Sequence, residues 1–146
     1  MTDLPRHSVS VTGIVLRDDG RVLAIKRHDD GRWVPPGGVL ELDETPQDGV
    51  AREVYEETGL KVQPLRLSGV YKNMRLGVVS LAFVCEVTGG EEHTSDESDR
   101  VAWLSRDEAV AAMPEARAVR VTDAFSEGGP FVRVHNGDVV LEPAAG

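Results

Sequence analysis

Three carboxylates share one face of a predicted helix near the middle of the chain. Glu53, Glu56 and Glu57 stand at positions i, i+3 and i+4, and a helix over Thr45 to Thr58 brings that spacing to one side. Like charges so placed cost roughly 0.2–0.5 kcal/mol per pair, and the C-terminal turns of a helix favour cations instead. Hard divalent cations such as Mg²⁺ prefer carboxylate oxygens. The cluster therefore predicts a metal site, and the alternative is a solvated acidic face partly neutralised by Arg52.

The residues around this cluster predict how it is positioned. Thr45 is a good helix N-cap, Pro46 suits the first helical position and Gly59 is a natural left-handed terminator. The preceding loop, Trp33 to Gly38, contains two prolines followed by two glycines, which neither a helix nor a central strand accommodates. A bent loop therefore leads into the helix.

Apolar, β-branched runs flank the helix and predict strands. Val9–Leu16 and Val22–Ile25 read as a hairpin around Asp18-Asp19-Gly20, and Leu76–Val87, apolar on both faces, is placed centrally in a sheet. The other expected elements are strands at Val62–Tyr71 and Val101–Leu104, helices at Ala109–Met113 (opened by a Ser105–Glu108 capping box) and Ala116–Phe125, and a hairpin at 131–142 around Asn136-Gly137. This order predicts an α+β fold, an α/β/α sandwich with a mixed sheet.

Composition bounds the class of protein. The chain has 146 residues and a formal net charge of −9, which predicts a single domain over 1–146 and argues against a nucleic-acid partner. No apolar run approaches the length of a membrane span and the N-terminus lacks a signal-peptide core, so we expect a cytoplasmic protein without a membrane partner. The single cysteine, Cys85, is expected to be a buried strand residue.

The residues from Gly38 to Leu60 resemble the Nudix box. Gly38, five residues, Glu44, seven residues and then Arg52-Glu53-Val54-Tyr55-Glu56-Glu57-Thr58-Gly59-Leu60 reproduce that motif without a departure. The resemblance implies a Nudix-type sandwich with the box helix packed on the sheet. It also implies a Mg²⁺-dependent hydrolase, with Mn²⁺ a possible substitute, acting on nucleoside diphosphates linked to another group.

The resemblance also implies roles for the box residues and one downstream carboxylate. The metal ligands would be Glu53, Glu56, Glu57 and the Gly38 carbonyl, while Glu44 and Arg52 would brace the loop against the helix and orient Glu53. The general base would be a box glutamate or Glu97, with Glu92 and Asp96 as rivals for the downstream position.

Candidates for substrate binding lie outside the box. They are Arg27, Trp33, Tyr71 and Arg75, and for each the alternative is an ordinary structural role: a surface arginine, a core tryptophan and a polar strand connection. His7, His28, His93 and His135 lack metal-ligand spacing and are expected at the surface. The hairpin at 131–142 is expected to cover a sheet edge or to join a homodimer interface.

The resemblance leaves three functions open. The tags that mark ADP-ribose, NADH and coenzyme A hydrolases are absent from the sequence, which favours a (deoxy)nucleoside triphosphate pyrophosphohydrolase. The alternatives are an ADP-ribose or nucleotide-sugar diphosphatase, and a catalytically idle Nudix-like module that senses a ligand.

Overall fold

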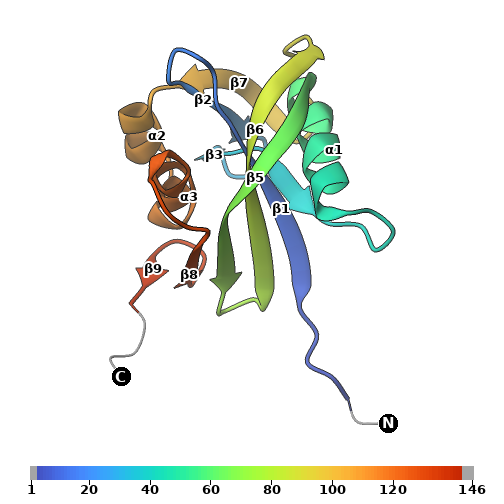
Figure 1. Cartoon of the computed structure of the whole chain (residues 1–146), viewed down its shortest axis with the longest axis vertical. Coiled ribbons are helices and arrows are strands. Elements are labelled where there is room, and N and C mark those ends of the chain that lie inside the picture. The colour runs from blue at the N-terminus through green and yellow to red at the C-terminus, as the bar shows by residue number, and fades with distance from the viewer. Residues whose placement is uncertain (1–2, 143–146) are drawn as a thin grey trace.

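The computed structural model describes residues 3–142, and its strands form two sheets (Figure 1). The larger sheet has six strands in the order β4-β1-β6-β5-β8-β9, which are β4 (Gly37–Val39), β1 (Ser8–Val15), β6 (Val78–Gly90), β5 (Leu60–Asn73), β8 (Phe131–His135) and β9 (Val140–Leu141). The smaller sheet consists of β3 (Trp33–Val34), β2 (Val22–Arg27) and β7 (Ser98–Leu104). Because β1 runs parallel to β6, and β5 to β8, while the other neighbours are antiparallel, the larger sheet is mixed.

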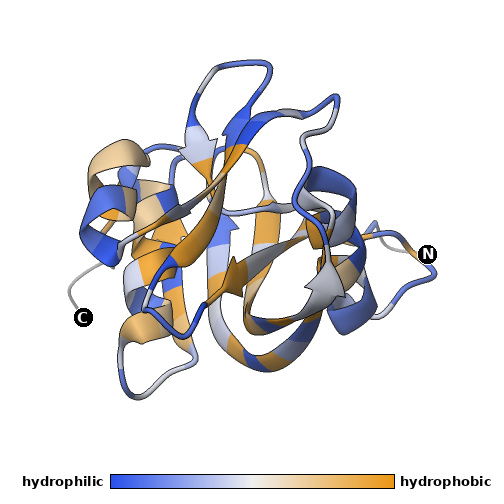
Figure 2. Ribbon diagram, turned by 90° about the horizontal axis from the view of Figure 1, so that it is seen from above, coloured by the Kyte–Doolittle hydropathy of each residue, from blue (hydrophilic) through white to orange (hydrophobic). Residues whose placement is uncertain are grey.

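Helices cover the strands from two sides. Helix α1 (Pro46–Thr58) lies on one side, and α2 (Arg106–Ala112) and α3 (Glu115–Phe125) lie together on the other (Figure 1). Hydrophobic residues concentrate on the strands and helix faces between these layers (Figure 2). The predicted α+β sandwich is therefore confirmed, although the predicted boundaries at residues 1 and 146 lie outside the described residues.

Alternate residues of β1 point into two separate cores. Val11 and Val15 pack with Val50 and Val54 of α1, whereas Ile14 packs with the residues of α2 and α3. All five are fully buried. A strand covered on both faces needs apolar residues at nearly every position, which explains the unbroken run in the sequence.

The contact between α1 and β1 is unusually close at Gly13. A Cβ atom there would lie 2.7 Å from Cγ2 of Val54, so this glycine lets the helix settle onto the strand. The depth of α1 in turn sets the position of the carboxylates that follow Arg52 on the same helix.

The predicted hairpin between the first two strands is wrong. β1 and β2 are joined by the expected turn but belong to different sheets, and only an isolated bridge connects Leu16 to Val22. β1 instead pairs with β6 along its whole length. The turn residues correctly predict that the chain reverses direction here. The partner strand of β1, however, follows from the burial of β1 on both faces, which favours an interior position beside a parallel strand.

The segment predicted as a bent loop, Trp33 to Gly38, bends at its prolines but also contributes two short edge strands, β3 and β4. The remaining elements agree closely with the sequence. β6 lies between β1 and β5, as its two-sided apolar pattern predicts, and Ser105 and Glu108 form the predicted capping box of α2. β8 and β9 pair antiparallel across the Asn136-Gly137 turn. Within residues 3–142 no helix combines the length and apolar character needed to cross a membrane.

Candidate functional site

The acidic face of α1 is held in place by well-defined helix ends. Thr45 Oγ1 accepts a hydrogen bond from the Asp48 N–H at 3.1 Å, and Pro46 follows in the first turn. Gly59 ends the helix in the left-handed conformation at φ 80°, with its N–H donated to the Tyr55 carbonyl. These caps fix where the last turn, which carries the carboxylates, stops.

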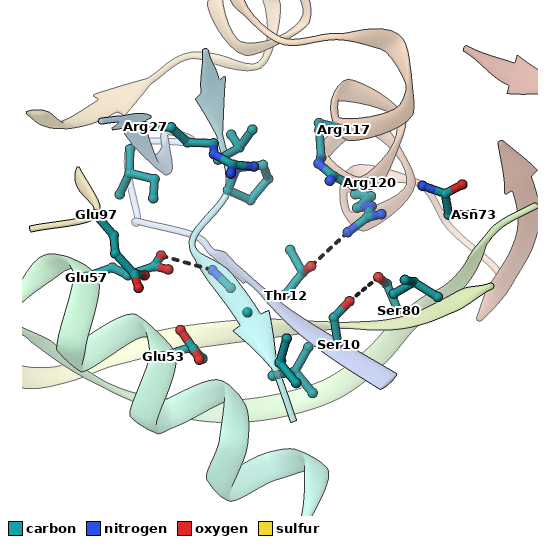
Figure 3. Close-up of a pocket in the computed structure, with 18 of the residues that line it drawn as sticks. Ser10, Thr12, Arg27, Glu53, Glu57, Asn73, Ser80, Glu97, Arg117 and Arg120 are labelled. Atoms are coloured by element: carbon teal, nitrogen blue, oxygen red, sulfur yellow. Dashed lines mark hydrogen bonds between the residues drawn. The ribbon is translucent and has the colours of Figure 1, made fainter. Parts of the chain in front are cut away.

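Three carboxylates converge beside this helix. Glu53, Glu57 and Glu97 each place an oxygen within 4.8 Å of the other two, and the first two are buried while Glu97 is exposed (Figure 3). The Gly37 N–H donates to Glu57 Oε2 at 3.1 Å, and a Cβ atom at Gly38 would lie 2.6 Å from the Glu53 carboxyl group. The two glycines therefore bring the backbone against the carboxylates: a side chain at Gly38 would collide with Glu53, and one at Gly37 with the backbone of Val11.

Burial disfavours the ionised form of Glu53 and Glu57. Desolvation raises the pKa of Glu57 to about 8, opposed by the Gly37 N–H and reinforced by Glu53 and Glu97. Desolvation also raises the pKa of Glu53, although Arg52 opposes it. Three adjacent carboxylates without a cation are electrostatically unfavourable, and a bound divalent cation would remove that penalty.

Glu56 stands apart from this cluster. Its side chain is 57% exposed and its Oε2 accepts a bond from Arg52 Nη1 at 3.3 Å. With about 100° of rotation per residue, Glu53 and Glu57 lie nearly in line on the helix, whereas Glu56 is turned away from Glu57 toward solvent. Sequence spacing groups the three glutamates, but the structure gathers only two of them and adds Glu97.

Arg52 and Glu44 form a brace between the loop and the helix. Arg52 donates to both carboxylate oxygens of Glu44, at 2.6 and 2.9 Å, and to Glu53 Oε1 at 2.9 Å. Bonds from Arg52 and from the Glu41 N–H lower the pKa of Glu44 to about 2. The bidentate geometry fixes the guanidinium plane, so Arg52 holds the Glu53 carboxylate in one orientation.

The downstream carboxylates separate clearly in space. Glu97 joins Glu53 and Glu57, whereas Glu92 accepts a hydrogen bond from the indole N–H of Trp103. Asp96 lines the same cavity as Glu97 without joining the carboxylate cluster.

A cavity of about 630 Å³ opens beside the carboxylates, within the range of small-molecule sites. Its acidic end is formed by Glu53, Glu57 and Glu97, and α3 contributes Arg117 and Arg120 to its lining (Figure 3). The cavity therefore has negative and positive side chains in different parts of its wall.

The expected surface position of His135 is wrong. The residue is 2% exposed and lines the cavity, because β8 lies inside the sheet against β5 and carries its last side chain inward. His7, His28 and His93 are exposed, as expected. Cys85 is buried on β6, also as expected.

Of the four substrate-binding candidates, the structure brings one to the cavity. Arg27 lines it while pairing with Asp29 at 2.6 Å. Among the described residues that form the cavity wall, Trp33, Tyr71 and Arg75 are absent.

Each of these three has a structural contact instead. Trp33 is half-buried and packs against the core on the α3 side, with the Arg100 guanidinium 5.6 Å from its ring. Tyr71 is fully buried and donates its hydroxyl to Asp123 at 2.8 Å, so a pocket role for Tyr71 does not agree with the structure. Arg75 is exposed and donates to the Asn136 carbonyl.

Sequence reasoning missed Arg117 and Arg120. They stand three residues apart on α3, the spacing that puts two side chains on one helix face, amid the buried Ala116, Val121 and Ala124. Two arginines on the inward face of an otherwise alanine-rich helix are the signal that could have identified them.

Comparisons with known proteins agree with this geometry. Residues 6–125 match the family profile described as the NUDIX domain. The chain is 57% identical over 136 residues to a MutT-like protein of Streptomyces ambofaciens, covering 93% of this chain and 88% of that protein. It is 38% identical over 98 residues to an ADP-ribose pyrophosphatase of Methanocaldococcus jannaschii, covering 62% of this chain and 57% of the relative. A solved ADP-ribose pyrophosphatase from Streptococcus suis is similar in fold, with a TM-score of 0.74 over 89% of this chain and 100% of that chain at 22% identity.

Proposed function

This chain belongs to the Nudix family of hydrolases, and we propose that it is a Mg²⁺-dependent pyrophosphohydrolase of (deoxy)nucleoside triphosphates. The observation that carries the proposal is the convergence of Glu53, Glu57 and Glu97 at one end of a cavity large enough for a nucleotide. Mn²⁺ would substitute for Mg²⁺, because both accept carboxylate and carbonyl oxygens.

The donor set fits a hard cation. Glu53 and Glu57 would be ligands together with the Gly38 carbonyl, and Glu97 is close enough to share the site or to act beside it. Glu56, exposed and paired with Arg52, would join only through a change of side-chain rotamer. When bound, the cation would neutralise diphosphate oxygens and lower the pKa of a coordinated water.

The protein's own groups would position the reaction. Arg52 holds Glu53 through a hydrogen bond of 2.9 Å, and the Gly37 N–H holds Glu57. Glu97 is the exposed member of the cluster, and we assign it as the group that accepts the proton of the attacking water at a carboxylate oxygen. Arg27, at the cavity wall, would contact a substrate phosphate.

A substrate panel tests this proposal. Nucleoside triphosphates, ADP-ribose and nucleotide sugars are supplied with Mg²⁺, and the products are identified. Release of pyrophosphate from triphosphates supports the proposal, and the Glu57→Gln variant should lose that release by orders of magnitude.

The relatives named as ADP-ribose pyrophosphatases favour a second candidate. Preferential formation of AMP from ADP-ribose, or hydrolysis of a nucleotide sugar, would establish that alternative. The third possibility, an idle ligand-sensing module, would require that no compound in the panel turns over, although the chain retains every glutamate of the box.

The location is proposed from composition, and the assembly from the hairpin at 131–142. We propose a cytoplasmic location, no nucleic-acid or membrane partner, and assembly as a homodimer. Cell fractionation and light scattering test these two points.

A further inference from the structure

Arg120 of α3 is a buried cation whose hydrogen bonds are incomplete. Its side chain is 3% exposed, and its Nη1 donates to Thr12 Oγ1 at 2.9 Å. Its Nε has no hydrogen-bond partner within residues 3–142. A buried guanidinium with an unmade hydrogen bond is energetically costly, so the site lacks an acceptor.

His135 strengthens this conclusion. Its Nδ1 accepts a hydrogen bond from the Gly137 N–H at 2.9 Å, which assigns the proton of the neutral ring to Nε2. Burial, followed by the two arginines Arg120 and Arg117, lowers the pKa of His135 to about 4, so the ring is neutral at pH 7. Nε2 lies 3.5 Å from Nη2 of Arg120, and two donors at that distance cannot satisfy each other.

Arg117 adds a second positive charge. It lines the cavity beside Arg120 (Figure 3), and it forms no ion pair with a side chain of residues 3–142. The carboxylates that most favour the charge of Arg117 are Asp138 and Asp30. Each already pairs with another arginine, Asp138 with Arg32 at 2.6 Å and Asp30 with Arg27 at 3.9 Å.

Asn73 turns a donor to the same part of the cavity. Its Oδ1 accepts from the N–H groups of Arg75 and Leu76, at 3.0 and 3.1 Å. The amide nitrogen, which can only donate, lies on the side of Arg120 (Figure 3). Guanidinium, imidazole and amide donors thus face a space that contains too few acceptors.

We propose that Arg117 and Arg120, with His135 and Asn73, form an anion subsite for a substrate phosphate or carboxylate other than the two phosphates being separated. This inference rests on the proposed hydrolase function for the identity of its ligand. It narrows the substrate class to diphosphates that carry an additional anionic group, such as the third phosphate of a nucleoside triphosphate or the carboxylate of a uronic-acid nucleotide.

The register of β1 and β4 places this subsite close to the carboxylates. Thr12, the partner of Arg120, lies directly opposite Gly37, whose N–H binds Glu57. Directly opposed residues of antiparallel strands are separated by about 5 Å between Cα atoms. One small substrate can therefore reach both ends of the cavity.

Binding of simple anions tests the subsite without the reaction. Calorimetry in EDTA at low ionic strength uses inorganic phosphate and, separately, acetate. The wild type should bind at least one of them at least tenfold more tightly than Arg117→Gln, a substitution at a half-buried position, and Arg120→Gln should show the same loss. Arg106→Gln, on α2 outside the cavity wall, is the matched control and should bind as the wild type does.

Kinetics then identify the source of the anion. The wild type should prefer a nucleoside triphosphate to its diphosphate, or a uronic-acid nucleotide to its neutral-sugar counterpart, by about tenfold or more in kcat/KM. Arg117→Gln should reduce that preference to within about threefold, while Arg106→Gln retains it.

Failure of this inference is distinguishable from failure of the proposed function. If Arg117→Gln binds phosphate and acetate as tightly as the wild type does, the subsite is overturned, even if the wild type hydrolyses its substrate rapidly. If Arg117→Gln loses the anion binding of the wild type, but the wild type hydrolyses no compound of the panel, the subsite is supported and the proposed activity is excluded.

Discussion

Glu57 should make the metal-free protein sensitive to pH. The residue is 4% exposed, and the pKa of its carboxyl group is raised from the usual 4.5 to about 8, mainly by burial. Between these two pH values the folded state keeps a proton on Glu57 that the unfolded chain releases. The contribution of the protonated Glu57 to stability is therefore complete below about pH 4.5 and is lost as the pH rises toward 8. Glutamine at this position cannot ionise, and its amide can still accept from the Gly37 N–H.

The magnitude follows from the shift in pKa. At about 1.4 kcal/mol per unit, the penalty for ionising Glu57 approaches a limit of roughly 5 kcal/mol, and at pH 7 it is about 3 kcal/mol. At pH 5 the same calculation gives less than about 1 kcal/mol. Glu57→Gln should therefore gain stability over the wild type steadily between these two pH values.

Urea unfolding in EDTA at several pH values from about 5 to 8 measures the effect, with the free energy of unfolding as the readout. Glu56→Gln is the matched control, because its carboxylate is exposed and paired with Arg52, and its difference from the wild type should change little with pH. A Glu57→Gln difference that stays constant across this range, or a variant less stable than the wild type at pH 8, would refute the electrostatic reasoning. Adding Mg²⁺ should make the wild type more stable than Glu57→Gln, because the wild type releases protons and binds the cation.

Three further substitutions test other parts of the site and core. Glu97→Gln should lower kcat by about 100-fold or more while changing the Mg²⁺ affinity little, as measured by steady-state kinetics and calorimetry; equal losses in both would make Glu97 a ligand only. Gly38→Ala would place a methyl group 2.6 Å from the Glu53 carboxyl and should weaken Mg²⁺ binding at least tenfold, whereas Gly89→Ala, with its nearest contact at 4.0 Å, should bind normally. Tyr71→Phe should cost about 1–2 kcal/mol in urea unfolding, because it removes a buried hydrogen bond, with kcat/KM of the folded protein unchanged; a large loss in kcat/KM would return this tyrosine to the substrate site.

Local signals made α1 predictable. The cap, the first-turn proline and the terminating glycine lie at or directly beside the ends of the helix, so Thr45, Pro46 and Gly59 define those ends without reference to the rest of the chain. The same holds for the capping box of α2, where Ser105 and Glu108 are three residues apart. Interactions of this range can be read from sequence.

Long-range packing explains what could not be predicted. The orientation of Glu56 depends on which side of α1 faces the sheet, and the partner of β1 depends on what covers its two faces. Arg120 reaches Thr12 across 108 residues of sequence. Spacing within α3 could have pointed to Arg117 and Arg120 as a pair, but no spacing rule connects them to Thr12, so their place in the cavity depends on long-range packing.

The cavity wall draws residues from both helical layers, with Glu53 on α1 and Arg120 on α3. A ligand that contacts both Glu53 and Arg120 would link the two helical layers to each other across the intervening strands. Ligand binding at 100 times Kd contributes about 2.7 kcal/mol to the folded state, and here that energy would resist separation of either layer. Amide protons of α1 and α3 should consequently slow their exchange with solvent in concert when the cavity is filled.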